Sequence, residues 1–313
     1  KKEYESIENY VSKFIDDESI FNYEELLLIN AKSFFELKDY EKSIYFFEKY
    51  KYINPEFSVV QFYELGYSYY ELGDYNNAIR NFNKIINSNN DVSPYGYYYL
   101  ANSYLAVNQK VEAANAFKSS FDGLKLIEDS YNDHSSGQLA ESAYYNFALL
   151  CYDLEKSLHN PIDVFNNFIK QYPDSDKLSE IYSYLSVLYL RTSDYDSAIS
   201  VLEKTIQDEG VKEKIQSIAY NRGVQLFSDQ DYDSAIMCFN KSISNSVSSE
   251  LEIHAMFWCA EAFFLQKDYK NSINILNDLL LLDPQEKIKN EALNTLSFSY
   301  NHLQNYEFSN NFF

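Results

Sequence analysis

The sequence predicts an all-α protein in which pairs of helices repeat along the chain. Its 313 residues include only seven glycines and five prolines, fewer turn residues than a β-sandwich or an α/β enzyme of this length requires. A short polar turn recurs at a nearly fixed interval, most often as aspartate before tyrosine. Residues 65–82, LGYSYYELGDYNNAIRNF, contain two helical half-patterns separated by a Gly-Asp turn. These observations indicate helical hairpins joined by tight turns.

The recurring turn sets the period of the repeat. Asp39 and Asp74 are 35 residues apart, and Gln109 follows after another 35. Later members of the series are 37 residues apart. The full series is Asp39-Tyr40, Asp74-Tyr75, Gln109-Lys110, Asp194-Tyr195, Asp231-Tyr232, Asp268-Tyr269 and Asn305-Tyr306. A period in this range is typical of a solenoid.

Each unit has the same internal pattern, which residues 58–91 show most clearly. Gly73 can end the first helix, and Asp74 is a good N-cap for the second. Small residues, Gly66 and Ala78, would let the two helices approach closely. The apolar positions of the unit are Phe62, Leu65, Gly66, Tyr69, Ala78, Phe82 and Ile85. One such hairpin buries too little surface to be stable alone, so neighbouring hairpins must stack.

This pattern resembles the tetratricopeptide repeat family, whose unit is about 34 residues long. Small residues recur at one position of the first helix and one of the second. They are Gly66, Ala101, Ala148, Gly223 and Ala260 in first helices, and Ser43, Ala78, Ala113, Ala198, Ala235 and Ser272 in second helices. The resemblance implies a right-handed α-solenoid that binds other proteins and carries no catalytic site.

The repeats divide the chain into five parts. Residues 1–19 read as the second helix of a truncated repeat, and residues 20–120 as an array of three repeats. In 121–140 we expect extra residues that lengthen the preceding helix and add a loop with glycine and serine at its end, and the array could divide in two there. Four repeats follow in 141–289, the first with a second helix capped by Asn160-Pro161, and a partial repeat ends the chain in 290–313. We expect the sequence to be a segment of a longer protein.

Composition argues against several kinds of partner. The formal net charge of −21 disfavours nucleic acid and anionic lipid surfaces. No apolar run of about 18 residues could span a membrane. The three cysteines form no CxxC pair, and none of the four histidines lies three or four residues from another histidine or a cysteine. We therefore predict no enzyme activity, no cofactor and no metal.

One stretch has the start of a calcium loop, DQDYDSAIMCFN at 229–240. A calcium loop needs glycine at its sixth position and glutamate at its twelfth, where this chain has Ser234 and Asn240. The aspartates are better explained as a helix N-cap and an acidic first turn.

The remaining functional candidate is a surface formed by the first helices. The phase of the repeat predicts a row of mostly aromatic side chains along their inward face. Its members are Tyr63, Tyr67, Tyr70, Tyr98, Asn102, Tyr145, Tyr152, Tyr220, Phe227, Phe257, Glu261 and Phe264. Such a row suits an extended or helical segment of a protein partner, because aromatic rings give large contact area at low entropic cost.

A narrower resemblance bears on location. Segments such as FNNFIKQYPDS, at 165–175, and MFWCAEAFFLQKDYKNSI, at 256–273, resemble long tetratricopeptide proteins of the bacterial cell envelope, especially in Bacteroidetes-type bacteria and related to Tol-Pal coordinator repeats. The resemblance implies a periplasmic or outer-membrane-associated assembly scaffold, with the cytoplasm as the alternative. Two other functions remain open: a spacer that self-associates through exposed repeat ends, and a peptide-sensing module of a larger regulatory protein.

Overall fold

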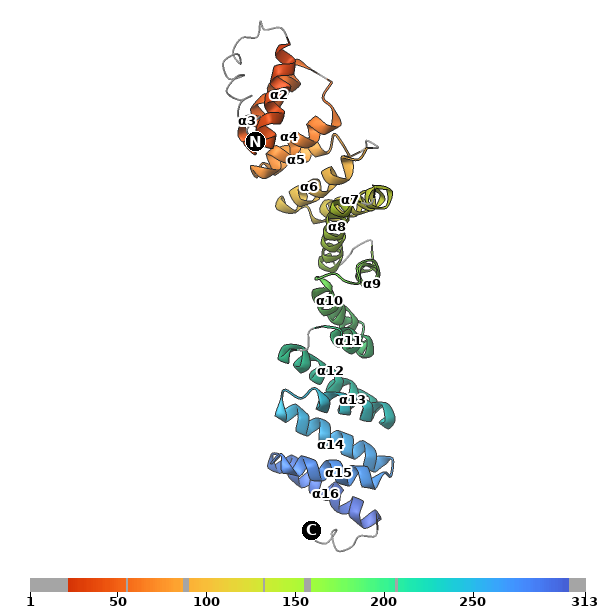
Figure 1. Cartoon of the computed structure of the whole chain (residues 1–313). Helices are drawn as coiled ribbons and strands as arrows, with labels where there is room; N and C mark the ends of the chain where they lie inside the picture. Colours follow the sequence, from red (N-terminus) through yellow and green to blue (C-terminus); the bar gives the residue numbers. More distant parts are fainter. Residues whose placement is uncertain are drawn as a thin grey trace. The chain divides into compact units, whose positions relative to one another are not determined.

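The computed structural model describes residues 22–54, 56–86, 90–131, 133–154, 159–205 and 208–303 (Figure 1). In these ranges the chain forms fifteen α-helices and no strand, so the predicted all-α solenoid class is confirmed. The half-repeat expected at 1–19 and the last residues of the partial repeat at 290–313 lie outside the described ranges. The handedness of the superhelix stays a prediction.

The first compact unit extends through Pro173 and contains four antiparallel hairpins. Each hairpin pairs a first helix with a second helix that follows it in the chain. The helices are α2 (Tyr23–Glu36), α3 (Tyr40–Ile53), α4 (Val59–Glu71), α5 (Tyr75–Phe82), α6 (Ser93–Ala106), α7 (Lys110–Tyr131), α8 (His134–Asp153) and α9 (Pro161–Gln171). Helix α4 contacts both α2 and α6 directly. The first helices of these three hairpins therefore form one continuous face.

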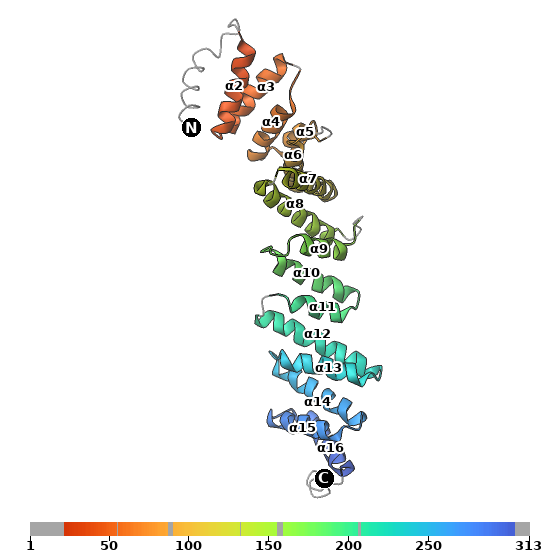
Figure 2. The same ribbon diagram turned by 45° about the vertical axis from the view of Figure 1, so that its right-hand side comes forward.

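The second compact unit begins at Asp174 and is built from the same hairpin. Its helices are α10 (Leu178–Arg191), α11 (Tyr195–Leu202), α12 (Glu209–Ser228), α13 (Tyr232–Ser244), α14 (Ser249–Leu265), α15 (Tyr269–Leu281) and α16 (Glu286–His302). Figures 1 and 2 show α12 to α16 stacked one after another, and each of them contacts the next in the chain. The core therefore runs as a series of apolar layers between successive helices.

The tight turns explain why the hairpin repeats with so few glycines. At Gly73 and Asp74 the backbone N–H groups donate to the carbonyls of Tyr70 and Tyr69 at 3.0 and 2.9 Å, which closes the end of α4. The Asp74 carboxylate then accepts from the N–H of Asn77 at 3.2 Å and caps α5, as predicted. One aspartate thus ends one helix and starts the next.

The same turn geometry recurs with other residues at the strained position. In six hairpins the residue directly before the N-cap position of the second helix has a left-handed backbone, with φ between 59° and 76°. These residues are Lys38, Gly73, Asn108, Ser193, Gln230 and Lys267. Only one of them is glycine, so the capping hydrogen bonds and the packing of the helices hold the other five in a conformation that L-residues disfavour.

The small residues lie where the two helices of a hairpin touch. All six predicted small residues of the second helices are fully buried, from Ser43 to Ser272. A Cβ atom added to Gly66 would lie 3.0 Å from the ring of Phe82, and one added to Gly223 would lie 2.7 Å from the ring of Phe239. The small residues therefore make room for a large side chain on the facing helix.

The helix before the expected connection at 121–140 is lengthened, as predicted, but the glycine and serine lie in the next helix rather than in a loop. Helix α7 has 22 residues and continues to Tyr131, and α8 begins at His134. Asp133 caps α8 by accepting from the N–H of Ser135 at 3.0 Å. Gly137 is buried where a Cβ atom would lie 2.4 Å from the Glu128 carboxylate. Ser136 and Gly137, expected in a loop, lie in the first turn of α8, and Gly137 leaves room for the Glu128 side chain of α7.

The division of the array also lies elsewhere than expected. The two compact units meet between Pro173 and Asp174, after α9, rather than near 121–140. The Asn160-Pro161 prediction is confirmed, because the Asn160 side chain accepts from the N–H of Ile162 at 3.0 Å and Pro161 is the first residue of α9.

The turn geometry leads to a paired stability prediction. Gly73 has φ of 76° and no atom within 4 Å of an added Cβ, so Gly73→Ala adds backbone strain without a clash. It should lower the free energy of unfolding by about 1 kcal/mol. Lys267→Gly relieves the same strain at φ of 65° and should raise that free energy by up to about 1 kcal/mol. Urea denaturation measures both, and equal effects of the two substitutions would contradict this explanation.

Candidate protein-interaction face

The residues of the predicted row all lie on first helices. Tyr63, Tyr67 and Tyr70 are on α4, and Tyr98 and Asn102 are on α6. The others are Tyr145 and Tyr152 on α8, Tyr220 and Phe227 on α12, and Phe257, Glu261 and Phe264 on α14. Phe257 is 8% exposed and packs in an apolar core with Leu276 and Leu296, whereas the other members are partly exposed. Phe257 is therefore poorly placed to contact a partner.

In the first unit the row is part of a continuous cluster of rings on α2, α4 and α6 and at the start of α3. Tyr67 is central: its ring centroid lies 4.7 Å from Tyr99, 5.7 Å from Phe35 and 6.0 Å from Tyr40. We call this cluster the aromatic face. It consists of Phe35, Tyr40, Tyr63, Tyr67, Tyr70, Tyr98 and Tyr99. Edge-to-face contacts between partly exposed rings give it a defined shape.

Tyr99 was missed by the sequence prediction although it joins α4 to α6. Its ring contacts Tyr63 at 6.2 Å, Tyr67 at 4.7 Å and Tyr70 at 5.3 Å. Tyr99 lies two residues before the small residue Ala101, a position that the prediction rule left out. The helical spacing could have revealed Tyr99, because it is three residues before Asn102 and so lies on the same face of α6.

The phenols of Tyr63 and Tyr67 have a raised pKa and remain protonated at neutral pH. Burial is the main cause that raises the pKa of Tyr67, followed by a hydrogen bond to the Glu71 carboxylate. Burial, with the neighbouring Tyr99 and Tyr95 phenols, raises the pKa of Tyr63. Neutral hydroxyl groups beside large rings can donate hydrogen bonds to carbonyl groups of a peptide.

A carboxyl group stands beside this cluster at Glu64 on α4. Burial raises its pKa to about 7, the nearby Lys32 ammonium opposes that shift, and the Glu36 carboxylate adds to it. Its Oε2 atom is buried without a hydrogen-bond partner. Desolvation disfavours the charged form, so Glu64 binds its proton more tightly in the folded chain than in the unfolded one.

The other first-unit members of the row face their own hairpin. The ring of Tyr145 lies 6.2 Å from Phe168, and the ring of Tyr152 lies 6.4 Å from Phe165, both on α9. Asn102 donates its side-chain amide to the Tyr98 carbonyl at 2.9 Å, within its own helix. These side chains extend the row along the unit, but the dense ring packing belongs to α2, α4 and α6.

The second unit has a separate and smaller set of rings. Phe227 contacts Trp258 at 5.1 Å, and Phe264 contacts Tyr269 at 5.6 Å. Trp258, like Tyr99, lies two residues before a small residue and was missed. Glu261 accepts a hydrogen bond from the Thr295 hydroxyl, and burial raises its pKa. Tyr220, the remaining member, lies 6.2 Å from the buried Phe239.

The described residues show little that suits catalysis or metal binding. Among them, no group of three or more His, Cys, Asp or Glu side chains could hold a metal ion. Asp231, in the stretch that begins like a calcium loop, caps α13 by accepting from the N–H of Ser234 at 3.2 Å, which confirms the N-cap interpretation. Burial raises the pKa of Cys259 to about 12, so its thiol is a poor nucleophile. No helix in the described ranges has the length and apolar character needed to cross a bilayer.

Comparison with known proteins identifies the repeat. Residues 62–89, which span most of α4 and α5, match a family model described as tetratricopeptide repeat. No curated protein matches the chain in sequence. The matched hairpin recurs in both units with the same kind of turn and with buried small residues at corresponding positions.

Several solved structures are similar to the chain at low identity. The TPR2AB-domain:pHSP90 complex of yeast Sti1 is 14% identical, covering 92% of this chain and 98% of that one, with a TM-score of 0.44. YrrB, described as a TPR protein with an unusual peptide-binding site, is 16% identical over 62% of this chain and 89% of its own, with a TM-score of 0.45. The C-terminal part of a TPR repeat-containing protein from Cytophaga hutchinsonii is 17% identical over 85% and 98%, with a TM-score of 0.40. All three TM-scores are below 0.5, so the assignment depends on the repeat match and on the hairpins themselves.

Glu64 yields a prediction about pH. Since its folded-state pKa of about 7 lies above the ordinary glutamate pKa of 4.5, the folded state binds the proton more tightly. This stabilisation is complete below the unfolded pKa and is lost as the pH rises through about 7. Glu64→Gln mimics the protonated side chain, so its Tm should exceed that of the wild type more at pH 8 than at pH 5.

Differential scanning calorimetry at both pH values measures this difference. The control is Glu56→Gln, at an exposed position before α4. The prediction fails if Glu64→Gln changes the Tm by the same amount at pH 5 and pH 8.

Proposed function

We propose that this chain, a tetratricopeptide-repeat protein, is a non-catalytic scaffold that binds a segment of another protein on the aromatic face. The observation that supports the proposal most strongly is the continuity of that face over α2, α4 and α6, with Tyr67 and Tyr99 joining the helices. Rings that are partly exposed yet fixed by their neighbours lose little conformational freedom when a partner binds.

The chemistry of the face indicates the kind of segment that it would bind. Aromatic rings offer apolar contact area, and their hydroxyl groups can bond to a peptide backbone. Glu36 and Glu71 lie beside the rings, and the whole chain carries a formal net charge of −21. A neutral to basic segment is therefore favoured over an acidic one, through complementary charge and faster association.

The place of action is proposed on sequence resemblance alone. The resemblance to envelope-associated tetratricopeptide proteins suggests a periplasmic or outer-membrane-associated scaffold for other envelope proteins. Fractionation of source cells with an antibody against this chain tests the location, and recovery in the cytoplasmic fraction would contradict it.

Site-specific photocrosslinking tests the binding face. A photoreactive phenylalanine derivative at Tyr70 or Tyr98 should crosslink one and the same partner segment, because both positions belong to the aromatic face. The matched control is the same derivative at Tyr52 on α3, which is 92% exposed and lies outside the face. Mass spectrometry identifies the crosslinked peptides.

The expected result is a shared peptide from positions 70 and 98 and none from position 52. Tyr98→Phe, which keeps the ring and removes only the hydroxyl group, should weaken capture of the peptide crosslinked from position 70 by about threefold to tenfold. Equal crosslinking from position 52, or crosslinks only to another copy of this chain, would contradict the proposal.

A further inference from the structure

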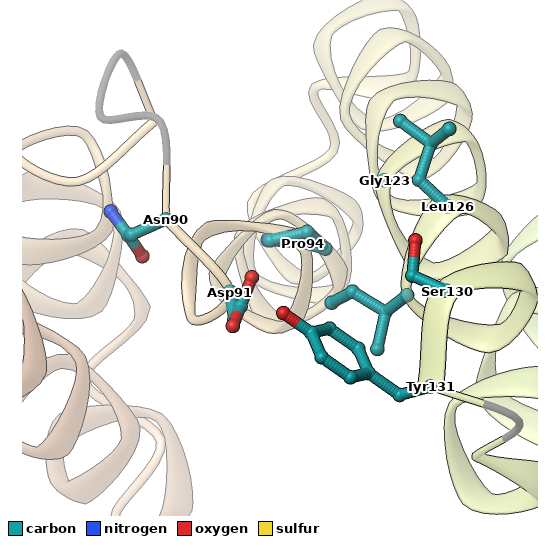
Figure 3. A pocket seen from close by; sticks show the side chains of 8 residues that line it. Asn90, Asp91, Pro94, Gly123, Leu126, Ser130 and Tyr131 are labelled. Carbon is teal, nitrogen blue, oxygen red and sulfur yellow. The ribbon is translucent and has the colours of Figure 1, made fainter.

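Helix α7 carries an apolar stripe on the part that extends beyond its own hairpin. The stripe comprises Gly123, Leu126, Ile127, Ser130 and Tyr131, at helical positions i, i+3, i+4, i+7 and i+8. With Asn90 and Asp91 in the turn before α6 and Pro94 in the first turn of α6, it lines a cavity of about 350 Å³ (Figure 3). This volume falls within the range of small ligand sites and holds one large side chain with its flanking backbone.

The cavity follows from the length of α7. The helix has 22 residues, whereas α3 has 14 and α5 has eight. Near its middle α7 approaches α6 closely: the Ser120 hydroxyl donates to the Pro94 carbonyl at 2.8 Å, and a Cβ atom on Gly123 would lie 2.5 Å from the Pro94 ring. Beyond this crossing α7 continues past the start of α6, and only the short turn before α6 faces the stripe.

Two large apolar or aromatic side chains of the stripe are mostly exposed. Leu126 is 69% exposed and Tyr131 is 67% exposed. Figure 3 shows the Tyr131 ring pointing across the cavity towards Asp91 and the Pro94 ring on the opposite side. The lining combines apolar side chains with the polar groups of Asn90, Asp91 and Ser130, a mixture that suits a protein segment with both apolar and polar groups.

The rim is negatively charged. Asp91 lines the cavity, and the carboxylates of Asp133 and Asp91 add to burial in raising the pKa of Tyr95, which places both on this side of α6. The nearby cation, Lys125, is paired with Glu128 at 2.6 Å, so it does not offset the aspartates. A ligand with positive charge beside an apolar group would complement both features.

We propose that this cavity is a second docking site, for a short segment of a partner protein with one large apolar side chain flanked by lysine or arginine. The apolar side chain packs between Pro94, Leu126 and Ile127, and a flanking cation meets the Asp91 carboxylate. The site uses α7 and the turn before α6 and shares no residue with the aromatic face, so it goes beyond the function proposed above.

Fluorescence anisotropy with synthetic peptides tests the site on the full chain. The probe is a labelled nine-residue peptide with leucine between lysine pairs. Two comparison peptides carry serine in place of leucine, or glutamates in place of the lysines. We expect saturable binding of the probe alone, and no saturation by any of the three up to about 1 mM would overturn the proposal, because a specific site should exceed about 4 kcal/mol.

Protein variants then locate the binding. Leu126→Ser should raise the Kd of the probe about fivefold, and Asp91→Asn should raise it about threefold and reduce its salt dependence. The matched control is Met237→Ser on α13, which is 73% exposed and should change the Kd less than about twofold. Equal Kd values for the wild type and Leu126→Ser would overturn the proposal.

Two further measurements separate the alternatives. If Tyr70→Ala abolishes probe binding and Leu126→Ser does not, the peptide occupies the aromatic face, which overturns this proposal and leaves the one above intact. If sedimentation velocity shows a dimer that Leu126→Ser dissociates, the occupant is a second copy of the chain, which also overturns it. If no partner crosslinks at position 70, the proposal for the aromatic face fails, but saturable binding of the probe peptide would still support the cavity.

Discussion

The fold depends on the close approach of two helices at paired small residues, with a large side chain filling the space beside them. Counting 16 residues from the small position of a first helix reaches a large residue of the second helix in six hairpins. The pairs are Ala31 and Phe47, Gly66 and Phe82, Ala101 and Phe117, Ser186 and Leu202, Gly223 and Phe239, and Ala260 and Leu276. Every large member is fully buried. Because the separation is constant, each turn must have the same length, which explains the recurring left-handed residue and aspartate cap.

This packing also decides which side chains are left for function. Residues that face the second helix of their own hairpin are committed to the core, as Leu65 and Leu100 are. Those on the remaining side of α4 and α6 can be aromatic without loss of stability, and their rings contact one another across helices. The position of the aromatic face thus follows from the small residues, which fix the side of each first helix that packs against the second helix. The overhang of α7 is the second such consequence, because a helix longer than its neighbours leaves apolar side chains without a facing helix.

The sequence was most informative where one local rule determines the structure. The N-cap at Asp74 and the buried small residues were predicted because spacing and side-chain size alone specify them. Tyr99 was missed because a face of a helix is broader than the three positions considered. The burial of Phe257 depends on packing against α15 and α16, the next two helices in the chain, which the pattern of its own helix does not specify. The helical connection at 121–140 depends on tertiary approach at Gly137, which overrides the usual preference of glycine for turns.

A double-mutant cycle on Gly223 and Phe239 tests the central packing claim most directly. The free energy of unfolding is measured for the wild type, Gly223→Ala, Phe239→Leu and the double variant. If the glycine makes room for the ring, Gly223→Ala destabilises the wild type, because its Cβ would lie 2.7 Å from the ring. In the Phe239→Leu background it should cost less or stabilise, with a coupling energy of about 1 kcal/mol or more. Additive effects within about 0.5 kcal/mol would contradict the account.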